Sequence, residues 1–187
     1  MRIIAPLPSK WVGKILPIFF IIAVLLNCSV ALAKDSDSIE VKFSPNQGAT
    51  KAIVKLIGEA KKSVRVAAYS FTSKDIATAL LAAHKRGVDV KAVMDKSNTK
   101  SDYSSAKFLT NVGIPTRINF EYAIMHSKYI IIDSLTVQTG SFNYSKAAEN
   151  KNAENIIILR NQPNIAKQFE NNWQTLWDES EDYEATY

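Results

Sequence analysis

Apolar residues recur along the chain with two periods, which alternate from residue 39 onward. Alternating or continuous apolar runs are typical of β-strands, whereas apolar residues at i, i+3, i+4 and i+7 are typical of one helical face. The pattern predicts strands over 39–43, 63–69, 88–94, 125–132, 136–142 and 155–159. It predicts helices over 49–60, 76–83, 104–112 and 163–177.

Glycine and proline mark several ends of these elements. Gly87 and Gly113 each follow a predicted helix, where a residue that tolerates a left-handed conformation is expected. Pro163 stands at the start of the last helix, where proline is tolerated. A short turn joins the strands over 125–132 and 136–142, which should pair as a hairpin. Without a linker or an internal repeat, this pattern predicts one α/β domain around a mixed sheet.

The segment 1–33 has the pattern of a secretory signal peptide. Three basic residues precede an apolar run over 15–26, and Ala31 and Ala33 are the small residues that a signal peptidase recognises. An uncleaved membrane anchor is the alternative, although 12 apolar residues are short for a span that needs roughly 20. We expect cleavage after Ala33, a periplasmic or secreted mature protein, and no stable membrane insertion after cleavage.

Cleavage would leave a chain without cysteine, because the single Cys28 lies in the signal segment. A disulfide framework and a multi-cysteine zinc site are therefore excluded. Residues 34–177 carry 20 basic and 13 acidic side chains, a net charge of +7, which suits a polyanionic substrate or an anionic membrane surface. Five acidic residues fall in the segment 178–187, which we expect to be a solvated, frayed tail.

Residues suited to catalysis cluster on the predicted hairpin. His126 and Lys128 are two residues apart on a strand, which places their side chains on one face. Ser141 and Asn143 share a face of the partner strand in the same way. A His-x-Lys pair alone is more often a solvated strand face. The four residues together offer a nucleophile or base, a cation and two neutral donors, which suits a phosphate that gains charge in its transition state.

The sequence resembles the phospholipase D superfamily. Its HxKx4D signature, followed by GSxN, is matched by His126, Lys128 and Asp133 and then by Gly140, Ser141 and Asn143. Glu154 resembles the acidic position that follows the signature. The resemblance covers nearly all of residues 39–177. Within the superfamily, the chain is most similar to small, exported, single-motif bacterial endonucleases. It implies a phospholipase D-like fold over 34–177, with a mixed central sheet and helices on both faces.

The resemblance implies a metal-independent phosphodiesterase that needs no cofactor and works in two steps. His126 would be the nucleophile and form a phosphohistidine, while a second motif histidine would protonate the leaving oxygen and later activate water. Lys128 and Asn143 would bind the phosphate oxygens, with Ser141 assisting. Glu154 would accept a hydrogen bond from the other ring nitrogen of His126 and fix its orientation.

Asp133 completes the candidate catalytic set of the signature. It stands at the hairpin turn with a parity opposite to that of His126, so we expect it to hold local structure. The implied mechanism also needs two motif copies, and this chain has one. The other histidine, His84, falls at the end of a predicted helix, where a positive charge suits the dipole, and we interpret it as structural. We therefore predict a homodimer with a shared active site, since a two-fold interface brings identical surfaces together.

Other aromatic and basic residues are open to two interpretations. The aromatic residues either stack on bases or belong to the core, and they are Tyr69, Phe71, Tyr122, Tyr129 and Tyr144. The lysines either follow a phosphate backbone or solvate a loop, and they are Lys91, Lys96 and Lys100. The polar segment 96–101 is suited to a mobile lip of the site.

Three functions follow from these observations. A sequence-nonspecific endonuclease acting on DNA is favoured by the basic body, and RNA is left open as a further substrate. A phospholipase D-type lipid phosphodiesterase, acting on phosphatidyl lipids or cardiolipin, would use the same chemistry. The chain has no long apolar insertion to seat acyl chains, which argues against it. The third is a noncatalytic binder of nucleic acid or membrane, against which the intact signature argues.

Overall fold

A computed structural model describes residues 38–100 and 104–184 of the chain. The predicted signal segment lies outside the described residues. The strands are β1 (Ser38–Ser44), β2 (Ser63–Ala68), β3 (Asp89–Asp95), β4 (Thr116–Asn119), β5 (Lys128–Ile132), β6 (Thr136–Gly140), β7 (Glu154–Arg160) and β8 (Ser180–Asp182). The helices are α2 (Ala49–Glu59), α3 (Lys74–Lys85), the 3-10 helix η1 (Lys96–Thr99), α4 (Ser105–Asn111), α5 (Lys146–Asn150) and α6 (Pro163–Asp178).

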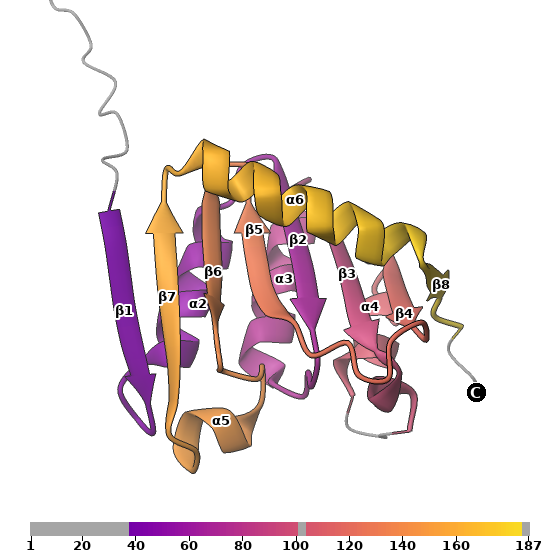
Figure 1. The fold of residues 1–187 in the computed structure, drawn as a ribbon, viewed down its shortest axis with the longest axis horizontal. Helices are drawn as coiled ribbons and strands as arrows, with labels where there is room; N and C mark the ends of the chain where they lie inside the picture. The colour runs from indigo at the N-terminus through magenta and orange to yellow at the C-terminus, as the bar shows by residue number, and fades with distance from the viewer. Residues whose placement is uncertain (1–37, 101–103, 185–187) are drawn as a thin grey trace, which may run out of the picture. The chain divides into compact units, whose positions relative to one another are not determined.

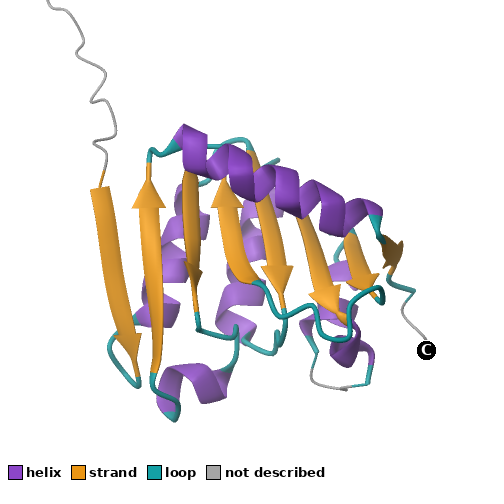
Figure 2. Cartoon of the chain, in the orientation of Figure 1, coloured by secondary structure: helices purple, strands orange, loops and turns teal. Residues whose placement is uncertain are grey.

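The strands form one eight-stranded sheet in the order β1-β7-β6-β5-β2-β3-β4-β8 (Figures 1 and 2). β2, β3 and β4 pair in parallel, and the other neighbours pair antiparallel. Helices α2, α3 and α4 lie on one face, and α6 crosses the other (Figure 1). The predicted mixed sheet with helices on both faces, and the predicted β5–β6 hairpin, are confirmed.

Two apolar clusters hold these layers together. On one face, α2 buries five apolar side chains against the sheet, and they are Ala49, Ala52, Ile53, Leu56 and Ile57. On the other face, α6 buries Ala166, Trp173 and Leu176 against Val93 and Ile131. Each large apolar side chain that is fully buried stabilises the fold by about 1.5–3 kcal/mol. The helical spacing of these residues is the reason that both helices were predicted from sequence.

The expectation of a frayed acidic tail is wrong for its first part. The last helix extends to Asp178, and β8 then adds to the edge of the sheet beside β4. Asp182 pairs in register with Arg117, whose Nε donates to Asp182 Oδ1 at 2.8 Å. Asn119 donates to Ser180 Oγ at 3.2 Å. These side chains on β4 compensate the acidic sequence, so the segment pairs instead of fraying.

The hairpin strands are shorter than the sequence predicts, and this matters for the site. β5 begins at Lys128 and β6 ends at Gly140, so His126, Ser141 and Asn143 lie in loops just beyond the strands. They are therefore placed by loop hydrogen bonds and not by strand pleating.

Candidate active site

The signature residues gather at one end of the strands, which we call the active edge, and the other ends of the strands form the far edge. Ala68, at the end of β2, pairs with Lys128 at the start of β5, and Gly140, at the end of β6, pairs with Ile156 near the start of β7. The strand directions thus bring the beginnings of β5 and β7 to the same edge as the ends of β2, β3 and β6 (Figure 1). The loops that leave this edge hold the catalytic candidates.

His126 is exposed at this edge while its backbone is fixed from behind. Its ring lies 4.5 Å from the ring of Tyr69, centroid to centroid, with an angle of 55° between the planes. The preceding Met125 is buried, and its N–H donates to Asp95 Oδ2 at 2.8 Å. Asp95 is itself buried and also accepts from Ser97 N–H. The imidazole is therefore open to solvent but carried by an anchored loop.

Lys128 is only 7% exposed, which is unusual for a lysine. Its Nζ donates to the backbone carbonyl of His126 at 2.7 Å and lies 5.2 Å from the centre of the Tyr69 ring. Burial lowers the pKa of Lys128 below its ordinary value, because the ammonium loses hydration, and the negative charge of Glu154 opposes part of that shift. The structure thus holds a partly desolvated cation directly beneath the imidazole loop.

Ser141 and Glu154 form a second cluster at the same edge. Ser141 Oγ donates to Glu154 Oε2 at 2.6 Å and accepts from Asn155 N–H at 3.1 Å. The glycine before this serine is required by close backbone packing. A Cβ on Gly140, which has φ +152°, would lie 2.2 Å from the carbonyl oxygen of Asn155. The signature glycine therefore allows β6 and β7 to approach closely enough to position Ser141.

The predicted hydrogen bond between Glu154 and His126 is not among the hydrogen bonds of the described residues. The carboxylate of Glu154 accepts instead from Ser141 and from Asn152 Nδ2, the latter at 3.0 Å. Asn143 differs from Ser141, since its buried Oδ1 has no hydrogen-bond partner among the described residues. Because Oδ1 only accepts, a hydrogen bond from Asn143 to a phosphate oxygen would have to come from its Nδ2.

Asp133 lies away from this edge, so its place in the candidate catalytic set stays a prediction. It follows the far end of β5, and its carboxylate accepts from the backbone N–H groups of Lys61, Lys62 and Ser63 at 2.6–2.8 Å. These three hydrogen bonds agree with the expectation that Asp133 holds local structure. His84 also lies at the far edge, in the last turn of α3, with Nε2 3.8 Å from a Cβ built on Gly113.

Residues 53–177 match the protein family described as "Cardiolipin synthase, PLD-like domain". The match spans more than half of the chain and includes the whole signature from His126 to Glu154. The chain belongs to the phospholipase D superfamily. The predicted phospholipase D-like fold and the predicted family are both confirmed.

Known members of the superfamily agree with this assignment. "Phospholipase D" from Rickettsia typhi is 39% identical over 136 residues, which are 73% of this chain and 66% of that relative. "Mitochondrial cardiolipin hydrolase" from Xenopus laevis is 31% identical over 138 residues, which are 74% of this chain and 64% of that relative. The matched part thus spans slightly less than two thirds of these curated relatives.

A solved structure extends the likeness to three dimensions. The phospholipase D family member Nuc from Salmonella typhimurium has 43% sequence identity and a TM-score of 0.78, and the match covers 80% of this chain and 100% of that chain. The fold therefore extends over the whole of that superfamily member as a single domain.

The exposure of the five aromatic candidates shows which of them belong to the core. Phe71 and Tyr144 are fully buried and Tyr129 is 4% exposed, so these three are core residues. Tyr69 lies against His126, and Tyr122 is 43% exposed on the loop that precedes it. Tyr129 and Tyr144 have raised pKa values, because burial disfavours the charged phenolate.

Sequence reasoning also missed residues of the phospholipase D site. Asp95, which anchors the loop before His126, carries no local signal because it is the last residue of an ordinary strand, β3. The predicted lip over 96–101 is a 3-10 helix over its first four residues, and Asn98 within it is buried and donates to the carbonyl of Tyr69. Lys96 Nζ donates to the carbonyl of Tyr122 at 2.9 Å, so it ties this helix to the loop before His126.

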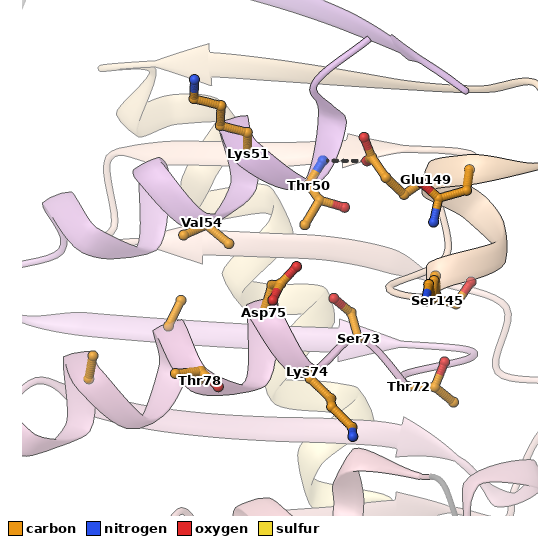
Figure 3. Close-up of a pocket in the computed structure, with 14 residues that line it drawn as sticks. Thr50, Lys51, Val54, Thr72, Ser73, Lys74, Asp75, Thr78, Ser145 and Glu149 are labelled. Carbon is orange, nitrogen blue, oxygen red and sulfur yellow. Dashed lines mark hydrogen bonds between the residues drawn. The ribbon is translucent and has the colours of Figure 1, made fainter. Parts of the chain in front are cut away.

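A hollow of about 960 Å³ lies between α2, α3 and α5, on the side of the phospholipase D-like domain that α6 does not cover (Figure 3). No signature residue lines it. Glu149 accepts from Thr50 N–H at 2.8 Å across one end of the hollow, which caps the first turn of α2. The hollow is thus separate from the chemistry.

Among residues 38–100 and 104–184, no three or more His, Cys, Asp or Glu side chains are grouped to hold a metal ion. Within the same residues, no helix combines the length and apolar character required to cross a bilayer.

Proposed function

We propose that this protein is a phosphodiesterase that cleaves nucleic acid, DNA and also RNA, without sequence preference and through a covalent intermediate on His126. The observation that carries the proposal is an exposed imidazole next to a partly desolvated ammonium, since Lys128 Nζ donates to the backbone carbonyl of His126. An exposed imidazole can reach phosphorus, and a cation that has lost part of its hydration interacts strongly with phosphate oxygens. Membership of the phospholipase D superfamily supports hydrolysis of a phosphodiester bond.

The proposed reaction has two displacements. In the first, a ring nitrogen of His126 attacks phosphorus, a P–N bond forms, and the bond from phosphorus to the leaving oxygen breaks as that oxygen takes a proton from a second histidine. In the second, that histidine accepts a proton from water, whose oxygen attacks phosphorus and breaks the P–N bond. Lys128 compensates charge on the nonbridging oxygens, and Asn143 Nδ2 donates to them. Ser141 assists by holding the Glu154 carboxylate, to which its hydroxyl donates.

The second histidine comes from a second copy of the chain in this proposal. His84 sits at the opposite edge of the sheet from His126, which leaves no other histidine within one described chain to take the role. A two-fold axis beside the active edge would supply another His126 together with another Lys128.

An exposed apolar surface supports such a dimer. Ile39, Val41 and Phe43 alternate along the edge strand β1 and are 66%, 47% and 51% exposed. They are continuous with half-buried Ile157 and Leu159, since Val41 pairs with Ile157 and Ile39 with Leu159. Figure 1 shows α6 crossing this face from β6 to β8, so that β1 lies outside its cover. Contiguous exposed apolar surface marks association sites. Because β7 and β6 separate β1 from β5, a contact between copies on this surface would stabilise the dimer in addition to the contact that brings the two His126 side chains together.

Val41→Asp tests this assembly. A charge in the middle of the apolar β1 surface should separate the copies because it would be buried unpaired. We expect light scattering to fall from about two chain masses to one, and turnover to fall more than about tenfold at the same chain concentration. Leu135→Asp is the matched control, because Leu135 is 43% exposed at the β5–β6 turn. A Val41→Asp protein that stays dimeric would reject this interface, and a fully active wild-type monomer would reject the shared site.

The lipid alternative has specific support in the names of the relatives. The matched proteins include a "Phospholipase D" and a "Mitochondrial cardiolipin hydrolase". Nucleic acid is favoured here by the net charge of +7 over residues 34–177 and by the lysines beside the site.

The proposed reaction needs no metal ion, because Lys128 supplies the positive charge at the phosphate that a divalent ion supplies in two-metal nucleases.

The purified mature protein should therefore cleave plasmid DNA and RNA in excess EDTA, and should cleave them faster than labelled phosphatidylglycerol or cardiolipin. Gel electrophoresis and thin-layer chromatography measure the two activities. The EDTA-treated protein with Mg²⁺ added back is the control. Complete loss in EDTA with recovery on adding Mg²⁺ would contradict the phosphohistidine mechanism. Hydrolysis of lipid alone would establish the alternative.

We also propose that the mature protein acts outside the cytoplasm. The proposal rests on the basic start, the apolar run and the Ala-x-Ala pattern that ends at Ala33. A periplasmic or secreted nuclease would meet nucleic acid that enters or surrounds the cell.

A further inference from the structure

A pocket of about 420 Å³ opens directly beside the catalytic histidine. Tyr69 joins the two, because its ring lies 4.5 Å from that of His126 and also lines the pocket. Pockets of this size are typical of sites for small ligands or parts of larger ones. A group bound in this pocket would therefore lie close to a phosphate bound at His126.

The lining of this pocket combines apolar and cationic side chains. Phe120 and Ile124 are 45% and 55% exposed, and both lie on the loop that leads to His126. Lys96 and Lys100 line the other side. Asp95 also lines the pocket, but it is 2% exposed, and both of its oxygens accept backbone N–H groups, so it presents little negative charge to a ligand.

The pocket is built by hydrogen bonds that are already in place. Lys96 Nζ donates to the carbonyl of Tyr122, and Tyr122 N–H donates to Asn119 Oδ1 at 3.4 Å. Tyr122 Oη donates to Glu179 at 3.1 Å, which ties the same loop to the residue after α6. The exposed aromatic and aliphatic side chains are therefore held on a braced loop, where a preorganised site costs less ordering on binding.

We propose that this pocket binds the base of the nucleotide next to the scissile phosphate, with Phe120 and Tyr69 contacting the base and Lys96 and Lys100 meeting flanking phosphates. This inference rests on the proposed nuclease function and deepens it. Planar bases stack on aromatic rings, and lysines follow the backbone, which is the recurrent chemistry of single-strand binding. A paired base has its faces covered by its neighbours, so the enzyme selects unpaired or locally opened strands.

Three substrates of equal length test the pocket: a single-stranded oligonucleotide, the same strand with tetrahydrofuran abasic sites in place of every base, and the duplex. We expect wild-type kcat/KM to be about tenfold higher on the single strand than on the abasic strand, and higher than on the duplex. Phe120→Ala should lower the rate on the base-bearing strand enough to remove that difference, while Phe120→Tyr should restore it. Phe108→Ala, at a 38% exposed phenylalanine on α4, is the matched control and should keep the difference.

The outcomes separate this pocket from the nuclease function itself. Equal cleavage of base-bearing and abasic strands by the wild type overturns the base pocket and leaves the nuclease function standing. Cleavage of neither strand overturns the function, and the base pocket with it. A Phe120→Ala protein that becomes monomeric in light scattering assigns Phe120 to the dimer interface and overturns the pocket. A Phe120→Ala effect confined to cardiolipin vesicles assigns the pocket to acyl chains and overturns it as well.

Discussion

His126→Asn should lower turnover by at least about 10⁴-fold, because it removes the nucleophile on which both displacements depend. The free energy of unfolding should change by less than about 0.5 kcal/mol, since the side chain is exposed and its ring contacts Tyr69 at the surface. Initial rates on single-stranded DNA and denaturation curves measure the two effects. His84→Asn is the matched control, because the same change at the far edge of the sheet should leave turnover intact.

The same variant tests whether the intermediate is covalent. Wild-type protein quenched in acid-free conditions during turnover should carry a nucleotidyl adduct, the remaining strand joined through phosphorus, on the peptide that contains His126, and His126→Asn should not. Two in-line displacements should also leave net retention of configuration at a chiral phosphorothioate. Net inversion would mean that water attacks phosphorus directly, and His126 would then be a general base. Turnover of His126→Asn near the wild-type rate would end the proposal.

The long elements of the fold were predictable because their signals are local. Helix α2 is predicted by five apolar residues at helical spacing, and the β5–β6 hairpin is predicted by two β-branched runs on either side of one turn. The short β8 was not predictable, because its sequence Ser-Glu-Asp favours solvent unless another strand supplies partners. Arg117 and Asn119 on β4 are those partners, and they lie far from β8 in the sequence. Pairing across that separation overrides the local preference.

The candidate site also has a part that was predictable from sequence and a part that was not. The predictable part is the set of residues with the fixed spacing of the signature, namely His126, Lys128, Ser141, Asn143 and Glu154. Their hydrogen-bond partners were not predictable, since the sequence led us to expect a bond from His126 to Glu154 where the structure has one from Ser141.

Residues that shape the surroundings of the site were missed for a related reason. Asp95 and Phe120 come from two separate segments, and only the packing of β3 against the loop before β5 brings them close to Tyr69 and His126. An isolated aspartate or phenylalanine after a strand carries no signal of such a role.

Lys128→Ala should remove roughly 2–4 kcal/mol of transition-state stabilisation. This loss corresponds to a decrease in kcat/KM of about 30-fold to 900-fold. The loss should fall mainly on kcat, because charge on the phosphate oxygens grows as the transition state forms. Lys128→Met keeps the length of the side chain without the charge and separates this electrostatic loss from a packing defect. A kcat/KM within about threefold of wild type in both variants would contradict the role of Lys128.

The pH dependence of the wild type should report the same cation. Only the ammonium form of Lys128 compensates phosphate charge, so kcat/KM should fall as pH rises through its pKa. Because burial lowers that pKa, the alkaline limb should lie below the ordinary lysine value of 10.5. Glu154→Gln removes the negative charge that raises the pKa of Lys128, so it should move the limb to still lower pH. Lys128→Arg is the control, because a guanidinium does not titrate in this range and the limb should disappear. An alkaline limb that stays in place in Lys128→Arg would assign it to another group.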